Sequence, residues 1–163
     1  MSERIRLRAE DTLDLAIISA LLQDARTSLS EMVYDAEERR FMVACTRYRR
    51  EKPHDVETCE GLTECPAVLV FDCIEEVKHR GLDAEDPGLE LSLLTIATEP
   101  GQRLMFHIDL VFDEDREIQL RSDCIDCRID DFGEPVVARR TPCDHFADLL
   151  KATPESDPAA SGG

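Results

Sequence analysis

Tryptophan is absent from this chain of 163 residues, and aromatic residues make up only 5% of it. The core must therefore consist of aliphatic side chains with a few phenylalanines. No run of about 18 apolar residues occurs, which excludes a membrane-spanning helix of ordinary length. The first ten residues lack the apolar stretch of a secretion signal. These absences predict a cytoplasmic, bacterial protein.

Basic residues are few, 19 against 36 acidic ones, and the net charge is −17. A field of that sign repels polyanions, so we do not expect nucleic acid as a partner. The lack of a long apolar run leads us to expect no membrane either. Glycine occurs only seven times. Neither of the common glycine-rich phosphate-binding loops is present, and no G-x-S-x-G motif marks a hydrolase nucleophile.

The seven cysteines are an odd number in a chain with no export signal, so we expect thiols or metal ligands rather than disulfides. Cys124 and Cys127 form one C-x-x-C, but the aspartates around it disfavour a reactive thiolate. The simplest interpretation is a pair of small buried apolar side chains, and no cofactor. The alternative is a structural zinc site made by Cys59, Cys65, Cys124 and Cys127.

Length and composition predict one α+β domain over residues 1–150, because 42% apolar residues suffice for a core. Residues 151–163 are small, acidic and proline-containing, which predicts a disordered tail. Asp11 is placed to cap a helix over 12–25, whose apolar residues cover a wide face.

From Thr27 the apolar period changes to two, which is typical of strands. The pattern predicts one hairpin around the polar turn at 35–38 and another from 104–112 and 117–122. It also predicts a long strand over 67–79. Residues 124–132 fit a short helix as well as they fit a strand, and a helical turn or two is expected within 145–151.

These elements predict an α+β fold. One N-terminal helix packs on a mainly antiparallel, strongly curved sheet or open barrel, with a short C-terminal helix. The strand order is left open.

One basic segment interrupts the acidic sequence, at the end of the second predicted strand. Arg47, Tyr48, Arg49 and Arg50 form a patch that suits a protein partner or an acidic ligand. The alternative is a solvated strand end. His107 lies on the polar face of the strand 104–112, where a small enzyme of unassigned class would use it as a base.

Several segments of the sequence resemble a family of small uncharacterised alphaproteobacterial proteins, the domain of unknown function DUF2948. The similar segments are LRAEDTLDLAIISALLQDA, MVYDAEERRFMVACTRYRRE, VKHRGLDAEDPGLELSLLTIATEPG and EIQLRSDCIDCRIDDFG, which together cover most of residues 5–133. The resemblance implies no activity and no catalytic residue. The function expected from the residues is a non-enzymatic binding or scaffold domain. A zinc protein and a small enzyme are the alternatives.

Overall fold

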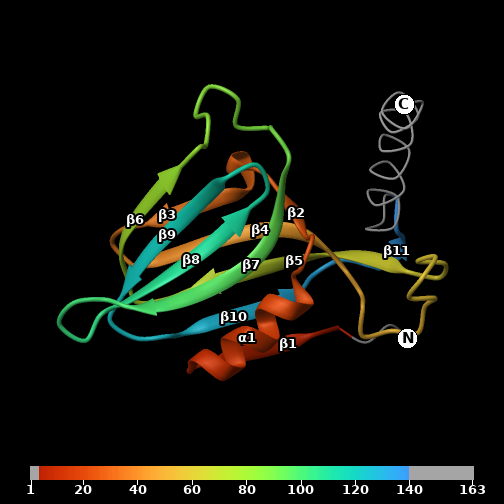
Figure 1. Cartoon of the computed structure of the whole chain (residues 1–163), viewed down its shortest axis with the longest axis horizontal. Coiled ribbons are helices and arrows are strands. Elements are labelled where there is room, and N and C mark those ends of the chain that lie inside the picture. Colours follow the sequence, from red (N-terminus) through yellow and green to blue (C-terminus); the bar gives the residue numbers. More distant parts are fainter. Residues whose placement is uncertain (1–3, 140–163) are drawn as a thin grey trace, which may run out of the picture.

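A computed structural model describes residues 4–139, which form one α-helix, one short 3₁₀ helix and a single antiparallel sheet. Figure 1 shows the helix lying beside the sheet. The order of hydrogen-bonded strands is β1-β10-β5-β4-β2-β7-β8-β9-β6, with β3 also paired to β4 and β11 to β5. The strands are β1 Arg6–Ala9, β2 Arg26–Thr27, β3 Met32–Asp35, β4 Arg40–Tyr48, β5 Thr63–Phe71, β6 Ile74–Arg80, β7 Leu91–Pro100, β8 Phe106–Phe112, β9 Arg116–Ser122, β10 Cys127–Asp131 and β11 Val136–Val137.

The sheet is not closed, because β1 and β6 are its two edges and do not pair with each other. The mainly antiparallel sheet and the single N-terminal helix confirm the predicted architecture at this level. The strong curvature stays a prediction. Among the described residues, no helix has the length and apolarity that crossing a bilayer requires.

The helix α1 spans Thr12–Leu21, four residues shorter than predicted. Asp11 caps it as expected, since its carboxylate accepts a hydrogen bond from the amide of Asp14 at 2.8 Å. The helix packs against β7 and β1 through residues such as Leu15 and Ile18, which are buried. The predicted apolar face is wider than the buried one, because Leu13 is 77% exposed.

Both predicted hairpins are present. β3 pairs with β4 across the polar turn, and β8 pairs with β9 in the register Ile108 to Leu120. The alternation is confirmed within β8, since Ile108, Leu110 and Phe112 are buried in the aliphatic core. The predicted start at 104 is wrong, because β8 begins at Phe106 and Leu104 is exposed in the turn before it. His107 and Val111 lie on the opposite, outer face of the sheet, because successive side chains of a strand point to opposite faces.

The single strand predicted over 67–79 is wrong. The chain forms β5 and β6 instead, which occupy distant positions in the sheet. The break falls at Cys73, whose φ of 66° lies in the left-handed region that no strand residue adopts. The apolar residues on either side hid this break, because only Asp72 and Cys73 separate Phe71 from Ile74 and the sequence reads as one strand.

The helix predicted as one option for 124–132 is wrong. Residues 127–131 form β10, which lies between β1 and β5. Ile129 is buried as the centre of an alternating strand pattern, so the period is two and not 3.6. The helical turns expected within 145–151 and the tail at 151–163 lie outside the described residues.

Candidate functional site

The outer face of the strands β7, β8, β9 and β6 carries rows of polar side chains. In the row nearest the β7–β8 turn, Glu99 pairs with His107, His107 with Arg121, and Arg121 with Glu76. Cross-strand partners share a face, with Cβ atoms about 5 Å apart. The sheet therefore holds alternating acidic and basic groups in one line, and a guanidinium nitrogen of Arg121 lies 3.8 Å from the carboxylate of Glu76.

An open cleft of about 900 Å³ lies over this end of the face. Its charged lining comes from three strands and one turn. Its lining residues are Glu75, Glu99, Pro100, Gly101, Gln102, Arg103, Met105, His107 and Arg121. Small-molecule sites are concave and combine apolar contact with a few convergent polar groups, and this cleft has both.

Two side-chain nitrogens of the cleft residues are buried without a hydrogen-bond partner among residues 4–139. They are Nδ1 of His107 and Nε of Arg121. Leaving a buried polar group unpaired costs about 1–3 kcal/mol, so such groups are uncommon in a folded protein. Their presence side by side on β8 and β9 marks this part of the face as unusual.

Gly101 lies directly against the His107 ring. A Cβ atom at Gly101 would lie 3.0 Å from Cδ2 and 3.1 Å from Nε2 of that ring. Only glycine leaves the ring this room, because real Cβ atoms rarely approach other atoms so closely. The Pro100–Gly101 pair, which the sequence marks as a strand end, thus shapes the wall of the cleft.

The β7–β8 turn that borders the cleft has a strained backbone. Arg103 and Leu104 have φ values of 56° and 63°, a left-handed conformation that costs non-glycine residues about 1–3 kcal/mol each. Hydrogen bonds hold the turn, from the amide of Gly101 to the carbonyl of Met105 and from the amide of Met105 to the carbonyl of Gln102. Leu104 is 92% exposed at the tip.

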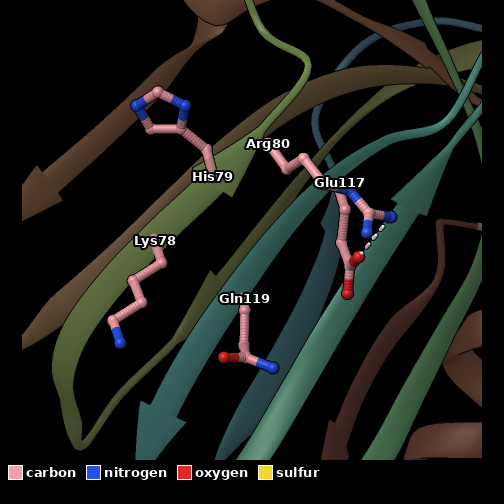
Figure 2. A pocket seen from close by; sticks show the side chains of 5 residues that line it. All are labelled: Lys78, His79, Arg80, Glu117 and Gln119. Carbon is pink, nitrogen blue, oxygen red and sulfur yellow. Dashed lines mark ion pairs between the residues drawn. The ribbon is translucent and has the colours of Figure 1, made fainter.

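A second, smaller hollow of about 150 Å³ lies further along the same strands. Figure 2 shows its lining on β6 and β9, with Lys78 and Gln119 beside the ion pair between Arg80 and Glu117. The ion pair measures 2.9 Å. Because its charges are paired and it is small, this hollow offers less to a ligand than the cleft.

Arg47, the first residue of the predicted basic patch, is not at the surface. Its side chain is fully buried and contacts two carboxylates. Nε and one terminal nitrogen donate to the Asp131 carboxylate at 2.8 and 2.7 Å, and both terminal nitrogens donate to Glu51 at 3.0 and 2.9 Å. A fifth hydrogen bond reaches the carbonyl of Tyr48. All five N–H groups of the guanidinium are therefore used inside the protein.

The contact with Arg47 changes the pKa values of the two carboxylates. Burial alone would raise the pKa of Asp131, but hydrogen bonds from Arg47 and from the amide of Ile5 outweigh burial and lower it. The pKa of Glu51 is lowered for the same reason, again against the effect of burial. The network thus joins strand β4 to β10 and to the residue that precedes β1.

The other three patch residues are also engaged. Arg49 is buried and its amide donates to Thr63, while the Tyr48 ring lies 5.8 Å from the guanidinium carbon of Arg50. Arg50 is the most exposed of the three, and it is paired with Asp24 at 2.8 Å. The use of this patch for a partner stays a prediction, and the burial of Arg47 and Arg49 weighs against direct contact through them.

The four cysteines of the predicted zinc site do not lie together. Cys65 and Cys127 are on adjacent strands, but Cys127 pairs with Phe71, six residues beyond Cys65. Six strand residues span roughly 20 Å. Cys59 is disulfide-bonded, which corrects the expectation that no cysteine forms a disulfide. Burial raises the pKa of the Cys65 thiol to about 11, as expected for an inert core cysteine.

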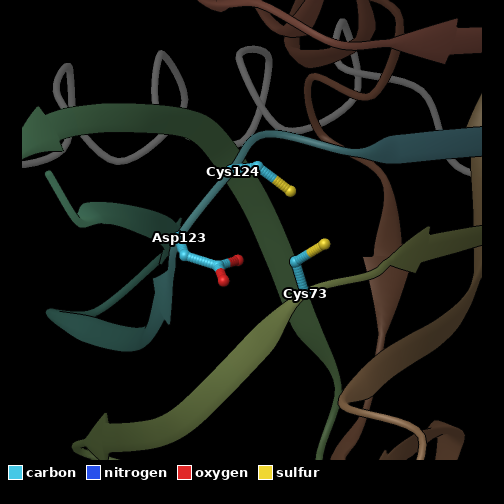
Figure 3. Close-up of side chains that lie close together, drawn as sticks. All are labelled: Cys73, Asp123 and Cys124. Atoms are coloured by element: carbon cyan, nitrogen blue, oxygen red, sulfur yellow. The ribbon is translucent and has the colours of Figure 1, made fainter.

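Another group of potential ligands does converge. Figure 3 shows the sulfurs of Cys73 and Cys124 facing each other beside the carboxylate of Asp123. One ligand atom of each lies within 4.8 Å of the other two. The sequence points to Cys124, but Cys73 is hidden there inside the apparent long strand. In the structure, Cys73 lies at the left-handed break after β5, where its half-buried side chain comes close to Cys124.

Sequence reasoning also missed most of the cleft. It places His107 on the polar face, but Arg121, Glu99 and Glu75 are unremarkable in a chain so rich in charge. The one signal that points to the site is the alternation in β8 and β9, which predicts that His107 and Arg121 face the same way once the register is known.

Comparison with known proteins identifies one family. The family model described as "Protein of unknown function (DUF2948)" matches residues 5–145. No curated protein and no solved structure matches the chain. The comparisons therefore assign no activity to this site.

Proposed function

From the premise that the chain belongs to the DUF2948 family of proteins of unknown function, we propose that it is a non-enzymatic cytoplasmic binding domain for a small zwitterionic molecule. The ligand lies in the cleft at the β7–β8 turn. Its carboxylate contacts Arg121 and Arg103, and its ammonium group contacts Glu75 and Glu99.

The observation that carries the proposal is the convergence of opposite charges in one open cleft. Arg121 and His107 stand beside each other on β9 and β8, and Glu99 flanks them on β7. The buried Nε of Arg121 has no acceptor among the described residues. A carboxylate is the usual partner of a guanidinium, since the two form parallel hydrogen bonds.

The net charge of the whole chain disfavours ligands that carry only negative charge. A phosphate or a polyanion would have to approach against a field produced by a net charge of −17. A zwitterion has no net charge and is not repelled as a whole. The acidic groups of the cleft, which would repel a simple anion, then become partners for the positive end of the ligand.

The lining of the cleft favours binding over catalysis. It contains no serine, threonine or cysteine that would act as a nucleophile, as far as residues 4–139 are concerned. Nδ1 of His107 has no hydrogen-bond partner within those residues, so this nitrogen lacks the carboxylate that orients the histidine of a catalytic triad.

Nuclear magnetic resonance titration tests this proposal. The twenty free amino acids are added to the ¹⁵N-labelled protein, together with the matching amines and carboxylic acids that lack one of the two charges. We expect at least one amino acid to shift the amide signals of 99–107 and 121, and the single-charge analogues to bind about tenfold more weakly.

The variant Arg121→Gln should weaken binding roughly tenfold to a hundredfold, because a hydrogen bond to a charged group contributes about 1.5–3 kcal/mol. Arg80→Gln is the matched control, since Arg80 lies on the same face but lines the smaller hollow. The proposal fails if no amino acid shifts the cleft signals at millimolar concentration, or if Arg121→Gln binds like the control.

A further inference from the structure

We propose that Cys73, Asp123 and Cys124 form a binding site for a single zinc ion, with two thiolates and one carboxylate as ligands. The three ligand atoms lie within 4.8 Å of one another. In a tetrahedral zinc site with zinc–sulfur distances of about 2.3 Å, neighbouring ligand atoms are roughly 3–4 Å apart. Small rotations of the three side chains are enough to reach that geometry.

The ligands come from two connections that the backbone holds together. Cys73 lies between β5 and β6, and Cys124 between β9 and β10. The amide of Asp72 donates to the carbonyl of Asp126 at 2.9 Å, which joins the two connections. The Ser122 hydroxyl donates to the carbonyl of Cys124, and the amide of Cys124 donates back to Oγ of Ser122 at 3.2 Å. The ligand backbones are therefore preorganised.

The charges around the cluster favour a bound cation. The carboxylate of Asp123 and that of the nearby Asp126 place negative charge beside the two thiols. This charge attracts a divalent metal ion, which displaces the thiol protons when it binds.

Arg39 completes the charge balance. Its terminal nitrogen lies 3.1 Å from Asp123 and 3.3 Å from Glu75, and it donates to the carbonyl of Cys73. Two thiolates, one carboxylate and Zn²⁺ carry a net charge of −1, which the guanidinium neutralises. Ligands held by a neighbouring group in this way are typical of metal sites. The mixed sulfur and oxygen ligands suit zinc better than calcium or magnesium.

Three protein ligands leave the fourth position of the zinc ion open, as in catalytic zinc sites. Glu75 lines the cleft and contacts Arg39, which contacts Asp123, so the proposed metal site and the cleft are two contacts apart. The zinc proposal does not depend on a ligand in the cleft. Its residues and its probe differ from those of the amino-acid titration.

Cobalt substitution of the full-length, reduced protein tests the site. Co²⁺ bound by thiolates gives a sulfur-to-metal charge-transfer band in the near ultraviolet and intense visible bands when it is tetrahedral. We expect one equivalent of Co²⁺ to produce both signals and one equivalent of Zn²⁺ to abolish them. The bands should disappear in Cys73→Ser and Cys124→Ser and persist in Cys45→Ser, where the altered cysteine lies in β4 away from the cluster.

Absence of the bands in the wild type, or their persistence in Cys73→Ser, overturns the proposal. If the reduced wild type takes up no metal and a mild oxidant joins Cys73 to Cys124, the pair is redox-active and the proposal is wrong. X-ray absorption of the zinc-loaded wild type provides a readout that needs no variant. Two sulfur neighbours with additional oxygen neighbours support the site, whereas no sulfur neighbour refutes it.

Discussion

Replacing Asp131 by Asn should destabilise the protein strongly, because it removes the charge that faces the fully buried Arg47. The Asp131 side chain is 2% exposed and accepts two hydrogen bonds from that guanidinium. Removing one partner of a buried ion pair costs about 3–5 kcal/mol. Glu51 still faces Arg47 but is partly exposed, so we expect a loss near the lower end, about 3 kcal/mol.

The matched control is Asp130→Asn, one residue earlier on the same strand. Asp130 pairs with Arg6 at 2.9 Å, but the Arg6 side chain is 83% exposed. An exposed ion pair of this kind contributes about 0–1 kcal/mol. The two variants therefore make the same chemical change at adjacent positions, one in a buried hydrogen-bonded network and the other in an exposed ion pair.

Thermal and urea unfolding, followed by circular dichroism, measure the difference. For a domain of this size, 1 kcal/mol shifts the melting temperature by roughly 2–4 °C, so Asp131→Asn should melt about 10 °C below the wild type. Equal stability of the Asp131 and Asp130 variants, within 1 kcal/mol, would refute the reasoning, because the buried network would then contribute no more than a surface pair.

The pH dependence provides a second test of the same network. The folded pKa of Asp131 lies below its ordinary value. Its contribution to stability is therefore complete above the unfolded pKa of about 3.9 and is lost as the pH falls through the lower folded pKa. The stability difference between the wild type and Asp131→Asn should be constant near neutral pH and shrink below about pH 4. A difference that grows toward acid contradicts the assignment.

Three further substitutions probe local features. Asp11→Ala removes the helix cap and should cost about 1 kcal/mol in a urea titration. Gly133→Ala should cost about 1–3 kcal/mol or more, since the new Cβ would lie 2.3 Å from the Pro66 ring; a melting temperature equal to that of the wild type would show that the loop moves freely. Gly101→Ala should displace the His107 ring and shift its imidazole resonances, while Gly88→Ala, whose new Cβ meets nothing within 4 Å, should leave them in place.

Much of the fold follows from the period of the apolar residues. The alternation in residues 104–122 predicts β8, β9 and their buried face, and Asp11 predicts the start of α1. The prediction fails where local pattern and tertiary structure disagree. Cys73 ends β5 through its backbone conformation, and a single Asp72 between Phe71 and Cys73 is too weak a signal to mark the break in the sequence. Short apolar spacing within 124–132 suits a helix and a strand equally, and only pairing with β5 decides it.

The candidate site depends on register, which a single sequence does not contain. His107 and Arg121 are fourteen positions apart in the chain, and their contact follows from a turn at Asp113–Asp115 that aligns β8 with β9. The basic patch fails for the opposite reason. Local charge suggests a surface, but Arg47 finds its partners at Glu51 and, 84 residues away, at Asp131. Burial of a charge is a property of the whole fold.

The pairing of β1 with β10 has a consequence for synthesis of the chain. Arg6 meets Asp130 across a sequence separation of 124 residues. At a translation rate of about 5–20 residues per second, the first strand leaves the ribosome roughly 6–25 s before its neighbour exists. The two arginines of β1 are charged side chains of the kind that disfavour edge-to-edge pairing of an unpaired strand with other chains. β1 is thus made well before β10 and is among the last strands to find its partner.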